Sequence, residues 1–179
     1  MIVDLENCRC RHYYCILIKF TYKRPEKWGM LADKFNLTEE QISKTYPLPL
    51  HVASGPYIRS FQYRVLNCIL FTNDLLFKIG YIANPNYTSM CNEALDTIQY
   101  LLFYCAVSQA FWINVIYTIL SKLSSYSYLL LNDVIVGFLR EEMDLENYVL
   151  LLGKIYLWDF RRNDNKPSIT HFIQILKNK

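Results

Sequence analysis

Apolar residues recur at helical spacing along most of the chain, which predicts an all-α protein. A capping box of Thr38 and Gln41 predicts a short helix that ends before Pro47. Pro49 and the run from Ser54 to Pro56 then extend a linker rich in turns. The next helix is predicted from four apolar residues that would share one face: Ile58, Phe61, Val65 and Ile69.

Cap signals divide the middle of the chain into two further helices. Asn73 and Gly80 suit the start and the end of a short helix, because asparagine caps N-termini and glycine adopts left-handed backbone at C-termini. Asp96 suits the N-cap of the following helix. That helix would present four residues to the core: Ile98, Leu101, Leu102 and Cys105.

The C-terminal third continues the helical pattern. A long amphipathic helix is expected from 107 to 123, with Phe111, Val115, Ile119 and Leu123 in register. A second, nearly apolar helix is expected from 144 to 162, and Pro167 suits the first turn of the last helix. Residues 129–138 have no decisive period; we expect a helix there, with a short strand as the alternative.

Composition and the lengths of the apolar runs bear on whether the protein is folded, spans a membrane or is secreted. The 179 residues fit one domain, and 53% hydrophobic with 20% charged residues argues against disorder. The longest apolar runs, at 13–18, 100–107 and 148–158, are too short to span a membrane. Six cysteines without a recognisable secretory leader favour an intracellular protein, cytoplasmic or nuclear, with reduced thiols.

Three runs of residues carry a likeness to a known family. They are Arg59–Asn67 (RSFQYRVLN), Thr72–Gly80 (TNDLLFKIG), and Asp96–Cys105 (DTIQYLLFYC) followed by Phe111-Trp112. They resemble the zinc-binding domain near the C-terminal end of reverse transcriptases from LINE-type, non-LTR retrotransposons. The likeness covers 57–112 and continues more faintly through 28–49 and 156–168. Residues 1–25 show none, so we expect an unmatched N-terminal segment followed by a single helical domain over 26–179.

The resemblance implies a zinc knuckle of the form Cys-x2-Cys-x8-His-x4-Cys. Cys91 and Cys105 occupy the second and fourth ligand positions, whereas Thr88 stands for the first cysteine and Tyr100 for the histidine. Tetrahedral zinc needs four thiolate, imidazole or carboxylate donors, which a hydroxyl and a phenol do not replace. We therefore expect an irregular helical bundle around a degenerate knuckle turn, held by apolar packing, with no cofactor and with the ancestral zinc lost.

Two other sets of side chains could serve as metal ligands. If zinc were retained, Glu93 or Asp96 would be the first substitutes for the missing ligands. Near the N-terminus, three cysteines and a histidine fall within eight residues, at Cys8, Cys10, His12 and Cys15. Their spacing matches no metal site known to us, and incidental cysteines in a terminal segment are the favoured interpretation.

The family domain is thought to help grip template RNA or target DNA, which makes basic residues candidates for phosphate contacts. The formal net charge is +3 with a pI near 8.5, so the support from overall charge is weak. The candidates are Arg59, Arg64, Lys78, Arg161, Arg162 and Lys166. For the last three, favourable interaction with a helix C-terminus is the plainer explanation.

Catalytic patterns are missing from the sequence. Its three histidines lie at no recognisable spacing from a nucleophile, and no Asp-Asp pair is present to hold the metals of a polymerase. We expect a non-enzymatic, retrotransposon-derived domain without the reverse transcriptase core, with at most weak affinity for RNA or DNA. The alternative is a helical module for protein–protein interaction or self-association, suggested by 15 tyrosines and 10 phenylalanines.

Overall fold

The computed structural model describes residues 26–53, 55–85, 95–124, 127–140, 142–161 and 166–178, with side chains from residue 31 onward. These residues form helices and no β-strand, so the all-α prediction is confirmed. The helices are α2 (Glu26–Phe35), α3 (Glu39–Thr45), α4 (Leu48–Val52), α5 (Pro56–Leu66), α6 (Asn73–Lys78), η1 (Tyr100–Tyr104), α7 (Ala106–Val115), η2 (Ile116–Leu120), α8 (Ser121–Leu123), α9 (Leu131–Val136), α10 (Asp144–Phe160) and α11 (Ile169–Lys177). The two η elements are π-helices.

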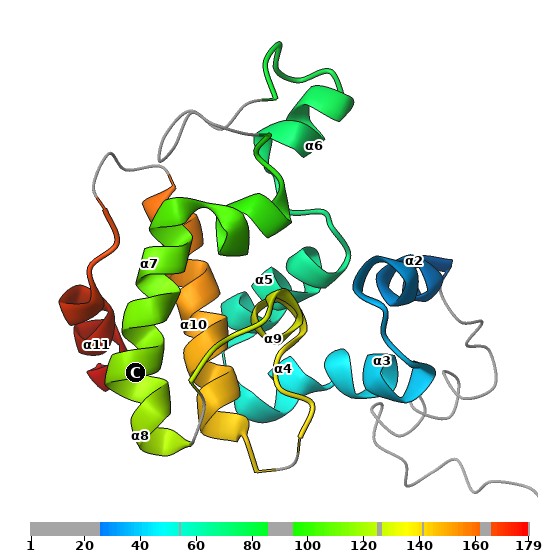
Figure 1. Cartoon of the computed structure of the whole chain (residues 1–179). Coiled ribbons are helices and arrows are strands. Elements are labelled where there is room, and N and C mark those ends of the chain that lie inside the picture. The colour runs from blue at the N-terminus through cyan, green and yellow to red at the C-terminus, as the bar shows by residue number, and fades with distance from the viewer. Residues whose placement is uncertain are drawn as a thin grey trace, which may run out of the picture.

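Helix α10 lies at the centre of the bundle (Figure 1). It contacts α4, α5, η1 and α11, and every residue from Val149 to Trp158 is buried. A helix surrounded by others must be apolar on all faces, which is what the run from 148 to 158 predicts. The predicted helix from 144 to 162 is confirmed to within two residues at its end.

Helices α5 and α7 pack one face each into the core. Ile58, Phe61 and Val65 are buried as predicted, but α5 ends at Leu66 and Ile69 lies beyond it, 37% exposed. The backbone turns at Cys68, whose φ of 54° is left-handed and cannot continue a helix. The predicted stripe was therefore one residue too long.

The predicted helix from 107 to 123 is interrupted by a π-helical turn. A π turn inserts one extra residue and so shifts the buried face around the helix axis. As a result Leu120 is fully buried, whereas Leu123, predicted to lie on the core face, is 41% exposed. Hydrophobic spacing alone does not reveal such an insertion.

Helix caps follow the predictions only in part. Thr38 and Gln41 form the predicted capping box, and Gly80 takes the predicted left-handed backbone with φ of 75°. The cap of α6 is Thr72 rather than Asn73, since the Thr72 side chain accepts the Leu75 N–H. Pro167 precedes α11, which begins after Ser168.

Two short segments turned out to be helical. The predicted linker contains α4, because Pro49 falls in the first turn of that helix, where its missing N–H costs nothing. Residues 131–136 form α9, so the helical interpretation of that segment is confirmed. None of the described helices has the length and apolar character needed to cross a membrane.

Candidate nucleic-acid interface and former metal site

An ion pair joins the segment before η1 to the end of the central helix. The Arg161 guanidinium at the end of α10 binds the Asp96 carboxylate, and it also donates to the Phe71 carbonyl and the Asn73 side chain at the start of α6. Asp96 Oδ2 in turn accepts the Asn73 N–H at 2.6 Å. We call Arg161, Asp96 and Asn73 the α6 latch.

The latch gives Asp96 a role different from the predicted one. Asp96 does not cap its own helix; Thr97 does, by accepting the Tyr100 N–H. Asp96 is fully buried, and desolvation raises the pKa of its carboxyl despite the Asn73 N–H and the Arg161 charge. Its Oδ1 has no hydrogen-bond partner among the described residues.

The two ends of the knuckle segment meet at this point. The Asp96 N–H donates to the Pro85 carbonyl at 3.1 Å, and the Asp74 N–H donates to the Asp96 carbonyl at 3.2 Å. Backbone hydrogen bonds thus join Asp96 to Pro85 and to the first turn of α6.

Only half of the predicted metal positions fall in the described part of the chain. Tyr100 and Cys105 begin and follow η1, where the Cys105 N–H donates to the Tyr100 carbonyl, and Cys105 is buried among core residues. Thr88 and Cys91, and the substitute ligand Glu93, lie outside the described residues, as do Cys8, Cys10, His12 and Cys15. Among the described side chains, no three His, Cys, Asp or Glu gather as a metal site would require.

The sharp corner between η1 and α7 depends on two side chains of the third run. Helix η1 ends at Tyr104, which leaves carbonyls of its last turn without helical partners. Ser108 Oγ donates to the Leu101 carbonyl, and Trp112 Nε1 donates to the Leu102 carbonyl at 2.7 Å. Trp112 therefore holds the corner in place from inside the core.

A second buried polar group lies where α5, α9 and α10 meet. Lys154 Nζ donates to Gln62 Oε1 at 2.6 Å and to the Ile135 carbonyl at 3.3 Å, and Gln62 Nε2 donates to the same carbonyl. Burial without a carboxylate partner lowers the pKa of Lys154 from 10.5 to about 7. Gln62 and Lys154 thus bind three helices together.

The structure separates the predicted phosphate contacts into two kinds. Arg161 is bound within the α6 latch, and its guanidinium stacks over the Trp158 ring. Arg59 donates to the carbonyl of Ala53, the residue that follows α4. Arg64 on α5 donates only within its own helix, and Lys78 on α6 is 66% exposed beside Asp74. Arg162 lies outside the described residues, and Lys166 is exposed ahead of α11.

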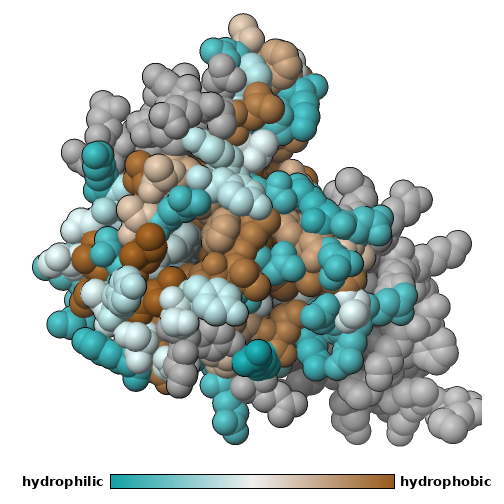
Figure 2. Space-filling view, viewed as in Figure 1, coloured by the Kyte–Doolittle hydropathy of each residue, from teal (hydrophilic) through white to brown (hydrophobic). Residues whose placement is uncertain are grey.

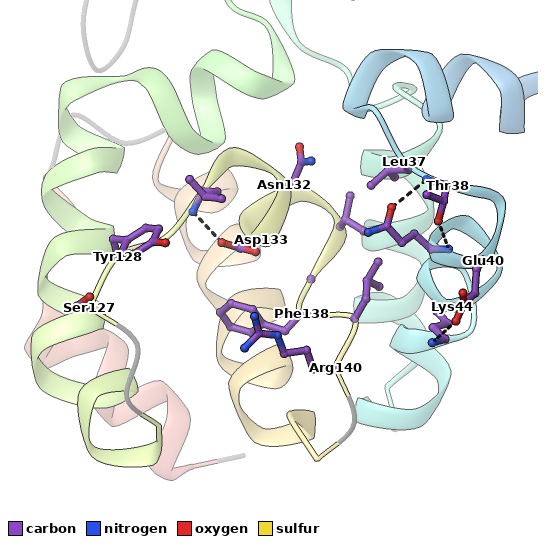
Figure 3. Close-up of a pocket in the computed structure, with 15 residues that line it drawn as sticks. Leu37, Thr38, Glu40, Lys44, Ser127, Tyr128, Asn132, Asp133, Phe138 and Arg140 are labelled. Carbon is purple, nitrogen blue, oxygen red and sulfur yellow. Dashed lines mark hydrogen bonds and ion pairs between the residues drawn. The ribbon is translucent and has the colours of Figure 1, made fainter.

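An open groove of about 930 Å³ separates α3 from α9 and the loop that follows it (Figure 3). Its charged side chains already have partners: Lys44 pairs with Glu40, and Asp133 accepts the Leu130 N–H. Burial raises the pKa of the Asp133 carboxyl. The residues that line the groove include no histidine or cysteine, so they offer no nucleophile and base in the usual combinations.

Sequence reasoning missed Gln62 and Lys154 as structural residues. A signal for Lys154 was present, because it interrupts an otherwise apolar run from 148 to 158. A charge inside a core helix needs a buried polar partner, although the sequence does not say which residue supplies it. Gln62 gave no comparable signal.

Comparison with known proteins does not assign the chain to a family. No protein-family model, no curated protein and no solved structure matches the chain.

Proposed function

We propose that this chain is a non-catalytic, intracellular domain derived from the zinc-binding region of a non-LTR retrotransposon reverse transcriptase. Its metal site has decayed, and its affinity for RNA or DNA is weak and sensitive to salt. In this proposal the chain retains the residues that form the ancestral fold and has lost the metal. It catalyses no reaction, since the reverse transcriptase core lies outside the resemblance.

The observation that carries the proposal is the role of polar residues in the resembling runs. Asn73 from the second run and Asp96 from the third are hydrogen-bonded to each other across 23 positions. Gln62 from the first run donates to the Ile135 carbonyl of α9, and α9 also contacts η1 of the third run. The second and third runs are thus joined directly, and the first is joined to the third through α9. This supports retention of the whole domain rather than a chance likeness in one helix.

Weak nucleic-acid affinity is supported by the state of the basic residues. Arg161 and Arg59 are already bound within the protein, which leaves Arg64, Lys78 and Lys166 as the described candidates with charge near solvent. Each phosphate contact contributes about 0.7 to the slope of log affinity against log salt concentration for single strands. So few contacts predict a shallow slope and poor binding at physiological salt.

A titration of single-stranded RNA across salt concentrations tests the proposal. We expect measurable binding at low salt and a slope that falls by about 0.7 for each phosphate contact removed, in Arg64→Met and in Lys78→Met. Lys177→Met at the end of α11 is the matched control and should leave the slope unchanged. A flat, undetectable response at low salt rules out the nucleic-acid role.

A further inference from the structure

Helix α6 projects from the helical body and contributes no residue to the core (Figure 1). We define the α6 arm as residues 71–85. Four large apolar side chains of the arm, together with Leu95 at its base, are between 46% and 78% exposed: Phe71, Phe77, Ile79, Tyr81 and Leu95. Apolar atoms are visible on the arm among polar ones (Figure 2).

The arm cannot cover these side chains by folding back, because the α6 latch fixes its base. Arg161 bonds to the Phe71 carbonyl and the Asn73 side chain, and Asp96 holds the Asn73 and Asp74 N–H groups. A short helix anchored at its first turn keeps a constant orientation. The five apolar side chains are therefore left exposed to solvent in this orientation of the arm.

The exposed area is large enough to matter for association. Because a large apolar side chain has about 200 Å² of surface, the five leave roughly 500 Å² open to water. Isolated patches of that size on monomers often mark interaction sites. If two copies paired through these five side chains, the area buried on both copies together would reach roughly 1,000 Å², the lower limit for specific protein interfaces.

The charges of the arm match a second copy of the same arm. Asp74 and Lys78 are the charged residues of segment 71–85, and they pair with each other at 2.7 Å, one turn apart on α6. Two α6 helices related by a twofold axis and running antiparallel would place Lys78 of each copy opposite Asp74 of the other, so that the pairs within the helices could extend across the axis.

We propose that the α6 arm is a self-association surface, through which two copies of this chain form a symmetric dimer. The apolar side chains supply the contact area, and the Asp74 and Lys78 side chains set the antiparallel register. This inference goes beyond the proposed nucleic-acid role and does not depend on it.

Sedimentation equilibrium over a range of protein concentrations tests the dimer. We expect the average mass to rise from monomer toward dimer in the unmodified protein and to stay monomeric in Ile79→Glu. The control Ile113→Glu changes an isoleucine of similar exposure on α7 and should dimerise normally. A monomer at all concentrations, or equal loss of dimer in both variants, overturns the proposal.

A charge exchange tests the register. Asp74→Lys and Lys78→Asp should each lose dimer when alone, because like charges then face each other, and a mixture of the two should recover a mixed dimer. Failure of the mixture to associate while the unmodified protein dimerises places the interface elsewhere. If Ile79→Glu abolishes RNA binding and leaves the mass distribution unchanged, the surface belongs to nucleic acid and the dimer proposal is wrong.

Discussion

Lys154 is a charged residue in the middle of the most buried helix, and its surroundings explain how it is tolerated. Its side chain is 1% exposed, and the oxygens of Gln62 and Ile135 take its hydrogen bonds without supplying a negative charge. A buried ammonium without a counter-charge favours the neutral amine, which is why its pKa falls. The residue therefore connects the stability of the fold to pH.

We expect the free energy of unfolding to rise with pH between about 7 and 10.5 through this residue. In that window the unfolded chain holds a proton on Lys154 that the folded chain lacks, so raising the pH favours folding. One proton corresponds to a slope of at most about 1.4 kcal/mol per pH unit. Urea denaturation at several pH values measures it.

Lys154→Met is the comparison that isolates the effect, since tyrosines and cysteines also titrate in this range. The difference between the two profiles should grow in favour of the unmodified protein as the pH rises. Parallel profiles would mean that Lys154 does not titrate in this window.

Gly153 on α10 lies against the rings of Trp112 and Phe111 on α7. A Cβ added at Gly153 would lie 2.6 Å from Trp112 Cη2, and the Trp112 ring cannot withdraw while its Nε1 holds the Leu102 carbonyl. Gly→Ala within a helix normally stabilises by about 1 kcal/mol. Here we expect Gly153→Ala to destabilise by about 1–3 kcal/mol in urea denaturation, as overpacking does.

A smaller ring at position 112 provides the control for this prediction. Added to Trp112→Phe, the Gly153→Ala change should cost less than it does alone, because the clashing atoms are gone. An additive result in the double variant would place the strain elsewhere.

At the scale of elements, the α6 latch decides where the α6 arm lies. Helix α6 has no buried residue, so its position depends on polar contacts rather than on the core. Asp96 is fully buried and the Arg161 side chain is 11% exposed, which makes the pair costly to break on one side only. An element held this way is tied to the body through few residues.

We expect Arg161→Met to destabilise the protein by about 3–5 kcal/mol, because Asp96 then stays buried without its counter-charge. Hydrogen exchange should accelerate at the Asn73 and Asp74 amides, which bond to Asp96. Asp96→Asn in the same chain should restore part of the stability, since no charge remains buried. Equal exchange rates in Arg161→Met and the unmodified protein would show that the latch does not position α6.

At the scale of the whole molecule, a continuous apolar core joins the helices. Its buried residues extend from Leu31 on α2 to Phe172 on α11 and include Cys105, a predicted ligand position. Burial of this kind contributes about 25 cal/mol per Å², enough in sum to hold helices in place without a metal. Zinc would add to such a fold rather than create it.

We therefore expect a chelator to leave the thermal unfolding midpoint of the unmodified protein unchanged. Thr88→Cys combined with Tyr100→His should bind zinc tightly and unfold at a temperature that rises with zinc concentration. Adding Cys91→Ser to that variant should remove the effect. Stoichiometric zinc in the purified unmodified protein would contradict the decay of the site.

Local sequence signals predicted the positions of the helices better than they predicted the contacts between helices. The capping box at Thr38 and the stripe of Ile58, Phe61 and Val65 involve neighbours within one or two turns, and all are confirmed. Asp96 and Arg161 were separate candidates for a cap and a phosphate contact, although they bind each other. Sixty-five residues separate them, so no local pattern could join them.

The sequence by itself determined the all-α class and the central helix, because helical periodicity and a long apolar run are properties of consecutive residues. Only the tertiary structure decided the use of the polar residues. A buried Lys154 or Asp96 is tolerated only where a distant side chain or carbonyl meets it, and folding alone sets that distance. The exposure of the apolar residues on the α6 arm was also decided by the tertiary structure. An apolar residue can be recognised as exposed only when the positions of its neighbours are known.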